Sequence, residues 1–138
     1  MSARTKARKR ALDVLYVADI RGETIPATLA VEQQRAAAEP DRQASWQYAR
    51  EIAEGFVEHQ DEIDELIETY SVNWTLARMP AVDRAILRIG VWELLFNDEV
   101  PDGVAISEAV EAATVLSTDD SAGFVNGLLA KIAQSKPA

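Results

Sequence analysis

Residues 79–96 read MPAVDRAILRIGVWELLF, and this stretch decides the fold class. Ala85, Ile89 and Trp92 recur at helical spacing along one face, and further apolar residues fill much of the other faces. A helix that is apolar nearly all round is a buried one. Pro80 stands where the first turn of a helix favours proline. The stretch therefore predicts a central, buried helix.

Helical spacing of apolar residues continues on both sides of this stretch, and no segment of strand length alternates with period two. We therefore predict an all-α single domain with about seven helices. Three further helices are expected before the central one: one closed by Gly22, one from Pro26 to about Ala38, and one from near Asp41. Residues around Ile63–Tyr70 form a fourth helix or an extension of the third. After the central helix we expect one around Ile106–Ala113 and one around Val125–Ile132, with Asp119, Asp120 and Ser121 as cap candidates for the last.

The composition is that of an ordinary folded domain. The chain has 138 residues, of which 48% are hydrophobic and 27% charged, and it has no cysteine. Disulfides and thiolate metal sites are thereby excluded. Asp13 and Asp19 interrupt the apolar stretch that a secretion signal needs, and the most apolar segment, Val82–Phe96, carries four charged residues. We expect a cytoplasmic protein without a membrane segment.

The formal net charge of −9 hides a strong segregation of charge. Residues 1–10 hold five basic residues and no acid, whereas the rest of the chain holds the other nine bases against all 23 acids, a balance of −14. A basic arm on an acidic body gives a polyanion one place to dock. If all five cations contacted single-stranded RNA, log K would change by about −3.5 per decade of salt. The alternative is a frayed, solvated terminus. The five residues are Arg4, Lys6, Arg8, Lys9 and Arg10.

Reading of RNA bases needs aromatic or amide side chains near these cations. Tyr16 lies two turns beyond Lys9, and Phe124 and Asn126 stand at the start of the last expected helix. Aromatic residues at helical spacing are more often core residues, so both interpretations stay open. Packing is also the main interpretation of the three tryptophans, Trp46, Trp74 and Trp92.

Catalytic chemistry finds little support in the sequence. His59 is the single histidine, and the acidic run from Asp61 to Glu68 beside it is typical of a solvated helix face. Every glycine stands alone, so the sequence has no phosphate-binding loop or dinucleotide fingerprint. We expect no enzyme, no cofactor and no metal.

Three motifs of the second half resemble those of the NusB family. They are VDRAILRIGVWEL at 82–94, VAISEAVEAA at 104–113 and SAGFVNGLL at 121–129. The start, RTKARKRALDVLYVADI at 4–20, is similar to the arginine-rich start of the family. Three motifs in the family's order and at its intervals are specific for its fold, and the resemblance covers essentially the whole chain, residues 1–138.

The resemblance implies two packed helical bundles and a role in processive antitermination of ribosomal RNA transcription. Members of the family bind the boxA element of nascent RNA. They do so together with NusE, a protein of the small ribosomal subunit, within the RNA polymerase antitermination complex. The expected function is therefore that of an RNA-binding transcription adaptor.

The resemblance also implies roles for individual residues. Asp83 corresponds to an acidic position on the NusE-facing side, where an acidic patch would complement a basic ribosomal protein. Tyr16 is a candidate for the same surface. The arm of residues 1–10, which leads into the first helix, corresponds through Arg4–Arg10 to the RNA-binding start of the family. A second strip beside the RNA corresponds to Asp119, Asp120, Ser121 and Phe124.

Two other functions are open on the sequence. One is a protein-binding helical scaffold, or a homodimer in which the basic arm is masked. The other is an enzyme module, because a related helical domain precedes the catalytic domain of some ribosomal-RNA cytosine methyltransferases. A chain of 138 residues leaves no room for a methyl-donor-binding domain, so we expect an adaptor and not an enzyme.

Overall fold

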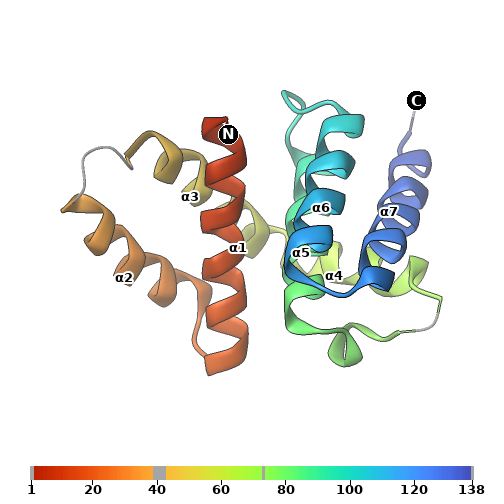
Figure 1. Ribbon diagram of the computed structural model, residues 1–138, viewed down its shortest axis with the longest axis horizontal. Helices are drawn as coiled ribbons and strands as arrows, with labels where there is room; N and C mark the ends of the chain where they lie inside the picture. Colours follow the sequence, from red (N-terminus) through yellow and green to blue (C-terminus); the bar gives the residue numbers. More distant parts are fainter. Residues whose placement is uncertain (1, 39–42, 73, 138) are drawn as a thin grey trace. The chain divides into compact units, whose positions relative to one another are not determined.

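The chain is all-helical, as the sequence predicts. The computed structural model describes residues 2–38, 43–72 and 74–137, and these form seven α-helices, one 3-10 helix and no strand (Figure 1). The helices gather into two compact units, Met1–Glu58 and His59–Ala138. Along the described ranges, no helix combines the length and the apolar run that a bilayer crossing requires.

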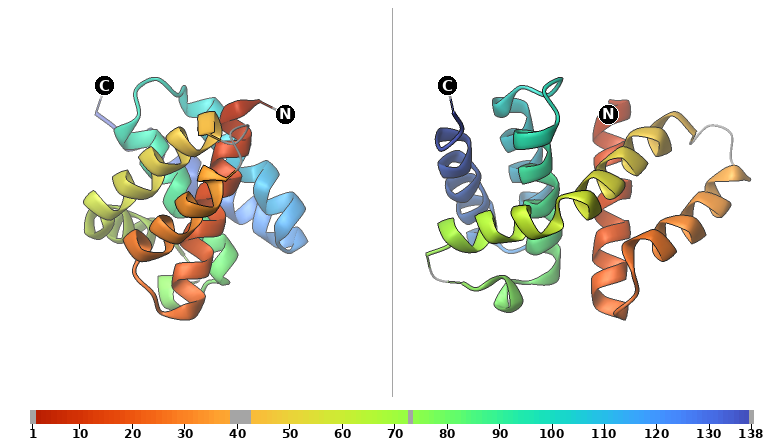
Figure 2. Two further views of the ribbon diagram at one scale, coloured as in Figure 1. Left: turned by 90° about the vertical axis from the view of Figure 1, so that its left-hand side faces the viewer. Right: turned by 180° about the vertical axis from the view of Figure 1, so that it is seen from behind.

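The first unit consists of three helices. Its bounds are α1 Ala3–Arg21, α2 Ile25–Ala37 and α3 Gln43–Glu58. Both α2 and α3 pack against α1, and the contact between α1 and α3 is the most extensive (Figures 1 and 2). The sequence predicts the start of the third helix near Asp41, a residue outside the described part of the chain.

Caps and an apolar stripe explain why α1 and α2 form where they do. Ala11 and Leu15 of the predicted stripe are 0% and 1% exposed. Gly22 ends α1 in the left-handed region, with a φ of 66°, which glycine adopts without steric cost. At the start of α2, the Thr24 hydroxyl accepts a hydrogen bond of 3.2 Å from the N–H of Ala27.

The third and fourth predicted helices are separate. His59, with φ −117° and ψ 21°, interrupts the helical backbone, and α4 (Gln60–Tyr70) begins after it. Ile63 and Ile67 of α4 are fully buried, so this helix is held by its apolar face. A short 3-10 helix, η2 (Leu76–Arg78), follows, and the sequence does not predict it.

The central helix of the second unit is α5, as the opening stretch predicts. It contacts α4, α6 and α7, and ten of its 16 residues are buried, so it is the core of this unit. Figure 2 shows α4 crossing α5 and α7. An added Cβ at Gly90 would lie 2.8 Å from Cδ1 of Leu129, so glycine permits the close approach of α7. The bounds are α5 Ala81–Phe96, α6 Asp102–Leu116 and α7 Asp119–Gln134.

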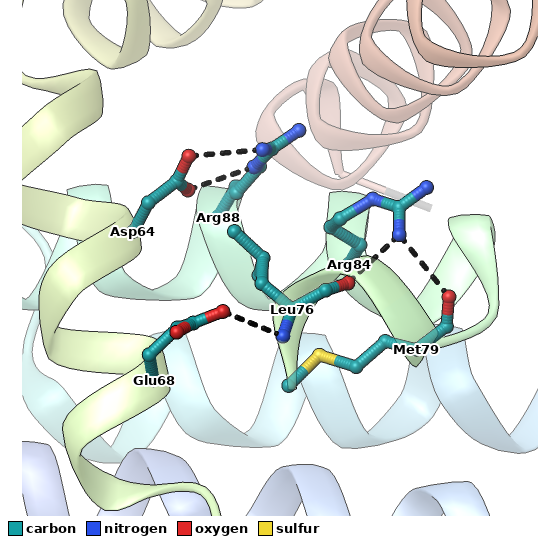
Figure 3. A network of polar contacts seen from close by, with 6 residues as sticks. All are labelled: Asp64, Glu68, Leu76, Met79, Arg84 and Arg88. Carbon is teal, nitrogen blue, oxygen red and sulfur yellow. Dashed lines mark hydrogen bonds and ion pairs between the residues drawn. The ribbon is translucent and has the colours of Figure 1, made fainter. Parts of the chain in front are cut away.

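A polar network fixes the connection between α4 and α5 (Figure 3). Arg88 of α5 makes a two-pronged ion pair with Asp64 of α4, with N–O distances of 2.9 and 3.0 Å. Glu68 of α4 accepts a hydrogen bond from the Leu76 N–H, and Arg84 donates to the Leu76 carbonyl. These hydrogen bonds pair backbone N–H and C=O groups that have no partner within a helix, and they hold the segment around η2 in place.

Two helix starts differ by one residue from the prediction. Pro80 is the N-cap residue of α5 and not a residue of its first turn. Thr118 is the N-cap residue of α7, and the cap candidates Asp119, Asp120 and Ser121 lie in the first turn instead. The two aspartates still stabilise this helix start, because negative charge is favourable near the positive end of the helix dipole.

Candidate nucleic-acid interface

The basic residues 4–10 form the first two turns of α1 and are not an extended arm. The Ser2 hydroxyl accepts a hydrogen bond of 3.0 Å from the Thr5 N–H, which caps the helix so that it begins at Ala3. Cations near a helix N-terminus are repelled by the helix dipole. Packing at this end of α1 therefore has to offset the repulsion.

The five cations differ in exposure. Lys6 and Lys9 are exposed, Arg4 and Arg10 are half-buried, and Arg8 is only 9% exposed. Residues of a helix follow one another at about 100°, so positions 4 and 8 fall on the side that carries the apolar stripe. The five cations are therefore not equally open to an RNA: the lysines face water, whereas Arg8 packs inward.

Tyr48 of α3 contacts two of the arginines. The guanidinium carbon of Arg4 lies 4.8 Å from the centre of the Tyr48 ring, and that of Arg8 lies 5.9 Å from it. Both distances are within the range of a cation–π interaction. Tyr48 is 8% exposed, so the ring itself is fixed by the core of the first unit.

Arg10 also contacts an aromatic residue of α3. Its guanidinium carbon lies 5.5 Å from the centre of the Trp46 ring, and its Nε donates a hydrogen bond of 2.8 Å to the Ser45 hydroxyl. The sequence predicts Trp46 only as a packing residue, and it does not single out Tyr48 or Ser45. A weak signal was available, since two aromatic residues stand close together on one expected helix.

One acid lies among the cations of α1. Asp13 follows Lys9 by one helical turn. Partial loss of contact with water raises the pKa of Asp13; Lys9 and Arg10 lower it, and Glu32 of α2 raises it further. Ionised Asp13 weakens the attraction of this helix for phosphate.

The second predicted strip belongs to α7, in the second unit. Asp119, Asp120 and Asn126 are exposed, and Phe124 is half-buried. The Phe124 ring meets the ring of Trp74 edge-on, with centres 5.3 Å apart and planes at 67°. Trp74 is 37% exposed, so it packs against Phe124 and also presents part of its surface to water. Two aromatic rings that are partly open to water suit the stacking of an unpaired base.

Asp83 is buried and belongs to no acidic surface. It is 0% exposed, and its carboxylate accepts hydrogen bonds of 2.5 Å from the Ser117 hydroxyl and 2.7 Å from the Ser121 hydroxyl. Ser121 is 1% exposed and lies 2.9 Å from the Thr118 hydroxyl. The assignment of Asp83 and Ser121 to direct contacts is therefore corrected. Both side chains lie inside the unit, where they fix the turn between α6 and α7.

Tyr16 lies on α1, beyond the cations, and is half-buried. Its predicted place in a partner-binding surface stays a prediction.

The single histidine has packing partners. The His59 ring stacks on that of Phe96, with centres 3.8 Å apart and planes at 8°, and its Nδ1 lies 4.0 Å from a carboxylate oxygen of Glu62. Within the described ranges, no group of three His, Cys, Asp or Glu residues is placed to hold a metal ion. The geometry gives this histidine a role in joining the start of α4 to the end of α5.

Sequence and structure comparisons agree on one family. The family model described as the NusB family matches residues 5–134, which span the helices from the first turn of α1 to the end of α7. The chain belongs to the NusB family. The resemblance of its motifs is thereby confirmed.

Relatives within the NusB family match along the whole chain. The transcription antitermination protein NusB of Clavibacter sepedonicus is 87% identical over 136 residues, which cover 99% of each chain. The protein of the same name from Arthrobacter sp. (strain FB24) is 56% identical, over 100% of this chain and 98% of its own.

Solved NusB structures share the fold. T. maritima NusB matches with a TM-score of 0.87 at 31% identity, over 100% of this chain and 95% of that chain. A chain from a crystal structure of the antitermination factors NusB and NusE in complex with dsRNA matches with a TM-score of 0.83 at 29% identity, over 99% of each chain.

Proposed function

We propose that this protein is a transcription antitermination adaptor that binds boxA RNA of nascent ribosomal RNA transcripts together with NusE. The observation that carries the proposal is the set of five cations on the first two turns of α1, of which the three arginines contact aromatic side chains of α3. Membership in the NusB family supports it, as does the likeness to a chain solved with NusE and RNA. An adaptor that binds nascent transcripts acts in the cytoplasm, which is the compartment expected from the sequence.

The cations of α1 have two physical roles in this proposal. The exposed Lys6 and Lys9 attract the phosphate backbone over a distance and make binding dependent on salt. Arg4 and Arg10 are half-buried, and their planar guanidinium groups suit two-pronged contacts with phosphate oxygens. The negative balance of the remaining chain repels phosphate, so the RNA backbone is attracted mainly to this helix.

Phe124 and Asp120 supply base contacts in this proposal. The partly exposed rings of Phe124 and Trp74 offer a stacking surface for an unpaired base. Asp120 repels phosphate, so its contribution is to accept a hydrogen bond from a base amino group. This strip adds base preference to the attraction that α1 supplies without regard to sequence.

NusE is the proposed protein partner, and the RNA polymerase antitermination complex is the assembly in which both act. A ribosomal protein is typically basic, and the acidic body of this chain complements it. Tyr16 is the proposed contact on α1. The partner is expected to raise the affinity for RNA, because it adds contacts to the same ligand.

A titration of boxA RNA and of a scrambled RNA, with and without NusE and at several salt concentrations, tests the proposal. Because Arg8 is buried, the clean charge variant is Lys6→Gln/Lys9→Gln. With Arg8 buried, four cations of α1 remain for phosphate, so its salt slope should fall from about −2.8 towards about −1.4, since each lost phosphate contact removes about 0.7. Lys131→Gln, an exposed lysine at the far end of α7, is the matched control. Equal affinity for both RNAs, or an unchanged slope in the double variant, would refute the proposal.

The alternative from the sequence, a protein-binding scaffold or a homodimer with the cations masked, makes a different prediction. Light scattering with and without RNA separates the two. A dimer that persists at saturating RNA favours the scaffold, and a complex of one chain with one RNA favours the adaptor.

A further inference from the structure

A hollow lies between α2 and α3 of the first unit, next to the tryptophan that contacts Arg10. Residues three apart share one face of a helix, and α3 lines the hollow with such a face. Trp46 forms part of the wall, and the guanidinium carbon of Arg10 lies 5.5 Å from the centre of its ring. This α2–α3 hollow therefore adjoins the basic end of α1. Its lining includes Gln33 of α2 and Ala44, Trp46, Gln47 and Arg50 of α3.

We propose that the α2–α3 hollow binds one unpaired nucleotide of the RNA, with Arg50 on its phosphate and Gln33 and Gln47 on the edge of its base. The inference rests on the proposed function and deepens it. It adds a site outside α1 that can select a nucleotide next to the cations.

The lining has the chemistry that a nucleotide requires. The hollow has a volume of about 480 Å³, within the range of roughly 300–1,000 Å³ for pockets that hold small organic ligands. Arg50 is exposed, and its planar guanidinium group suits phosphate oxygens. None of the described lining residues is acidic. The carboxamides of Gln33 and Gln47 both donate and accept hydrogen bonds, which matches the mixed donors and acceptors of a base edge.

Trp46 gives an independent reason to expect a polar ligand. The residue is 8% exposed, and its Nε1 is buried without a hydrogen-bond partner in the described part of the chain. A buried indole N–H normally has a partner. An unmet donor on a residue of the wall favours a ligand that carries acceptors, and every base carries them. The hollow is therefore better suited to a base than to a purely apolar group.

Alkylation of a single introduced thiol locates the nucleotide. The chain has no cysteine, so Ala44→Cys places one thiol at an exposed position of the hollow. With boxA RNA at about ten times its Kd, alkylation by iodoacetamide should slow about tenfold, because only the free chain reacts. Ala27→Cys, at an exposed position near the start of α2, is the matched control and should react equally fast with and without RNA. An unprotected thiol at position 44 would overturn the inference.

The same assay separates the possible occupants of the hollow. Uridine and adenosine monophosphate are added alone, at the concentration of the RNA. Protection by RNA without protection by either mononucleotide supports the inference. Protection by a mononucleotide but not by RNA would assign the hollow to a free metabolite and overturn it. Protection by NusE in the absence of RNA would assign the hollow to the protein partner and overturn it as well.

Two variants test the separate roles of the charge and of the amides. Arg50→Gln should make the salt slope of boxA binding less steep by about 0.7, the value of one phosphate contact. Arg21→Gln, exposed at the other end of α1, is the matched control and should leave the slope unchanged. Gln33→Ala/Gln47→Ala should keep the slope and reduce the preference for boxA over scrambled RNA about three- to tenfold. An unchanged slope together with an unchanged preference would overturn the inference.

The outcome also tells this inference apart from the proposed function. If the wild type prefers boxA RNA and Lys6→Gln/Lys9→Gln lowers the slope, the proposed function stands whatever Ala44→Cys shows. If neither holds, the proposed function fails, and the inference fails with it.

Discussion

Replacement of Asp83 is expected to destabilise the second unit and to leave the cations of α1 unchanged. The Asp83 carboxylate is 0% exposed and accepts hydrogen bonds from Ser117 and Ser121. A hydrogen bond to a charged group contributes about 1.5–3 kcal/mol, so Asp83→Ala should lower the free energy of unfolding by about 3–5 kcal/mol. For a chain of this length each kcal/mol lowers the melting temperature by about 3 °C, which gives about 9–15 °C in total.

Asparagine should be tolerated better than alanine at this position. Its side-chain oxygen still accepts from one serine, and its amide group donates to the other, because a hydroxyl can both give and accept a hydrogen bond. Only the charge assistance is lost, so Asp83→Asn should cost about 1–2 kcal/mol. The order wild type, Asn, Ala in melting temperature is the pattern expected of a buried acceptor.

Thermal and urea denaturation followed by far-UV circular dichroism measures these differences. Asp98→Ala, in the exposed connection between α5 and α6, is the control and should stay within about 0.5 kcal/mol of the wild type. The folded Asp83 variants should keep the salt slope of RNA binding of the wild type, because the charges of α1 are unchanged. An alanine variant that melts within about 2 °C of the wild type and yet loses a protein partner would refute the reasoning, because it would show Asp83 in a direct contact.

Three other side chains, on different helices, can be tested separately. Asp13→Asn should tighten RNA binding about two- to threefold, because it removes a negative charge beside the cations. Because the pKa of Asp13 is raised in the folded protein, its protonated form favours folding; this contribution is present below the ordinary pKa and is lost as pH rises through the raised pKa. The gain of the variant in RNA affinity and in melting temperature should therefore shrink as pH falls. A gain that stays constant with pH would contradict this. Arg88→Gln breaks the ion pair between Arg88 and Asp64, in which the two side chains are 12% and 21% exposed. It should lower the free energy of unfolding by about 2–4 kcal/mol in urea denaturation, and a loss below about 1 kcal/mol would count against this. Phe124→Ala should weaken RNA binding about fivefold or more, and RNA should quench the emission of Trp74 in the wild type; binding without quenching would remove this strip from the interface.

The helices could be predicted from the sequence because their information is local. The stripe of Ala11 and Leu15 and the end of α1 at Gly22 follow from spacing and from one glycine, and the structure confirms both. The helix η2 has only three residues, too few to show a period, and the network that holds it comes from α4 and α5. The N-cap of α7 is Thr118, and the residues after it, Asp119, Asp120 and Ser121, are equally good cap residues, so sequence alone does not choose among them.

For the candidate site, the sequence predicts the chemical type of the residues but not their exposure. The cations of α1 are evident from composition, but the inward position of Arg8 depends on Tyr48, which lies 40 residues further along the chain. Asp83 has the right chemistry for a partner contact, yet its surroundings come from Ser117 and Ser121, which belong to the turn between α6 and α7. Exposure is a property of tertiary packing, so a sequence pattern gives the charge of a residue and not its accessibility.

At the basic end of α1, the choice between arginine and lysine matches the surroundings of each position. Arginine, with its weakly hydrated planar group, stands at positions 4, 8 and 10, where rings of α3 lie beneath it; lysine, with its strongly hydrated ammonium, stands at the exposed positions 6 and 9. The arginines therefore belong to the packing of the first unit and to its proposed RNA surface at the same time. A change at Arg8 is therefore expected to lower stability. If α1 binds RNA as proposed, a change at Lys6 or Lys9 should alter binding alone, so the lysines are the positions at which RNA affinity should be adjustable without cost to the fold.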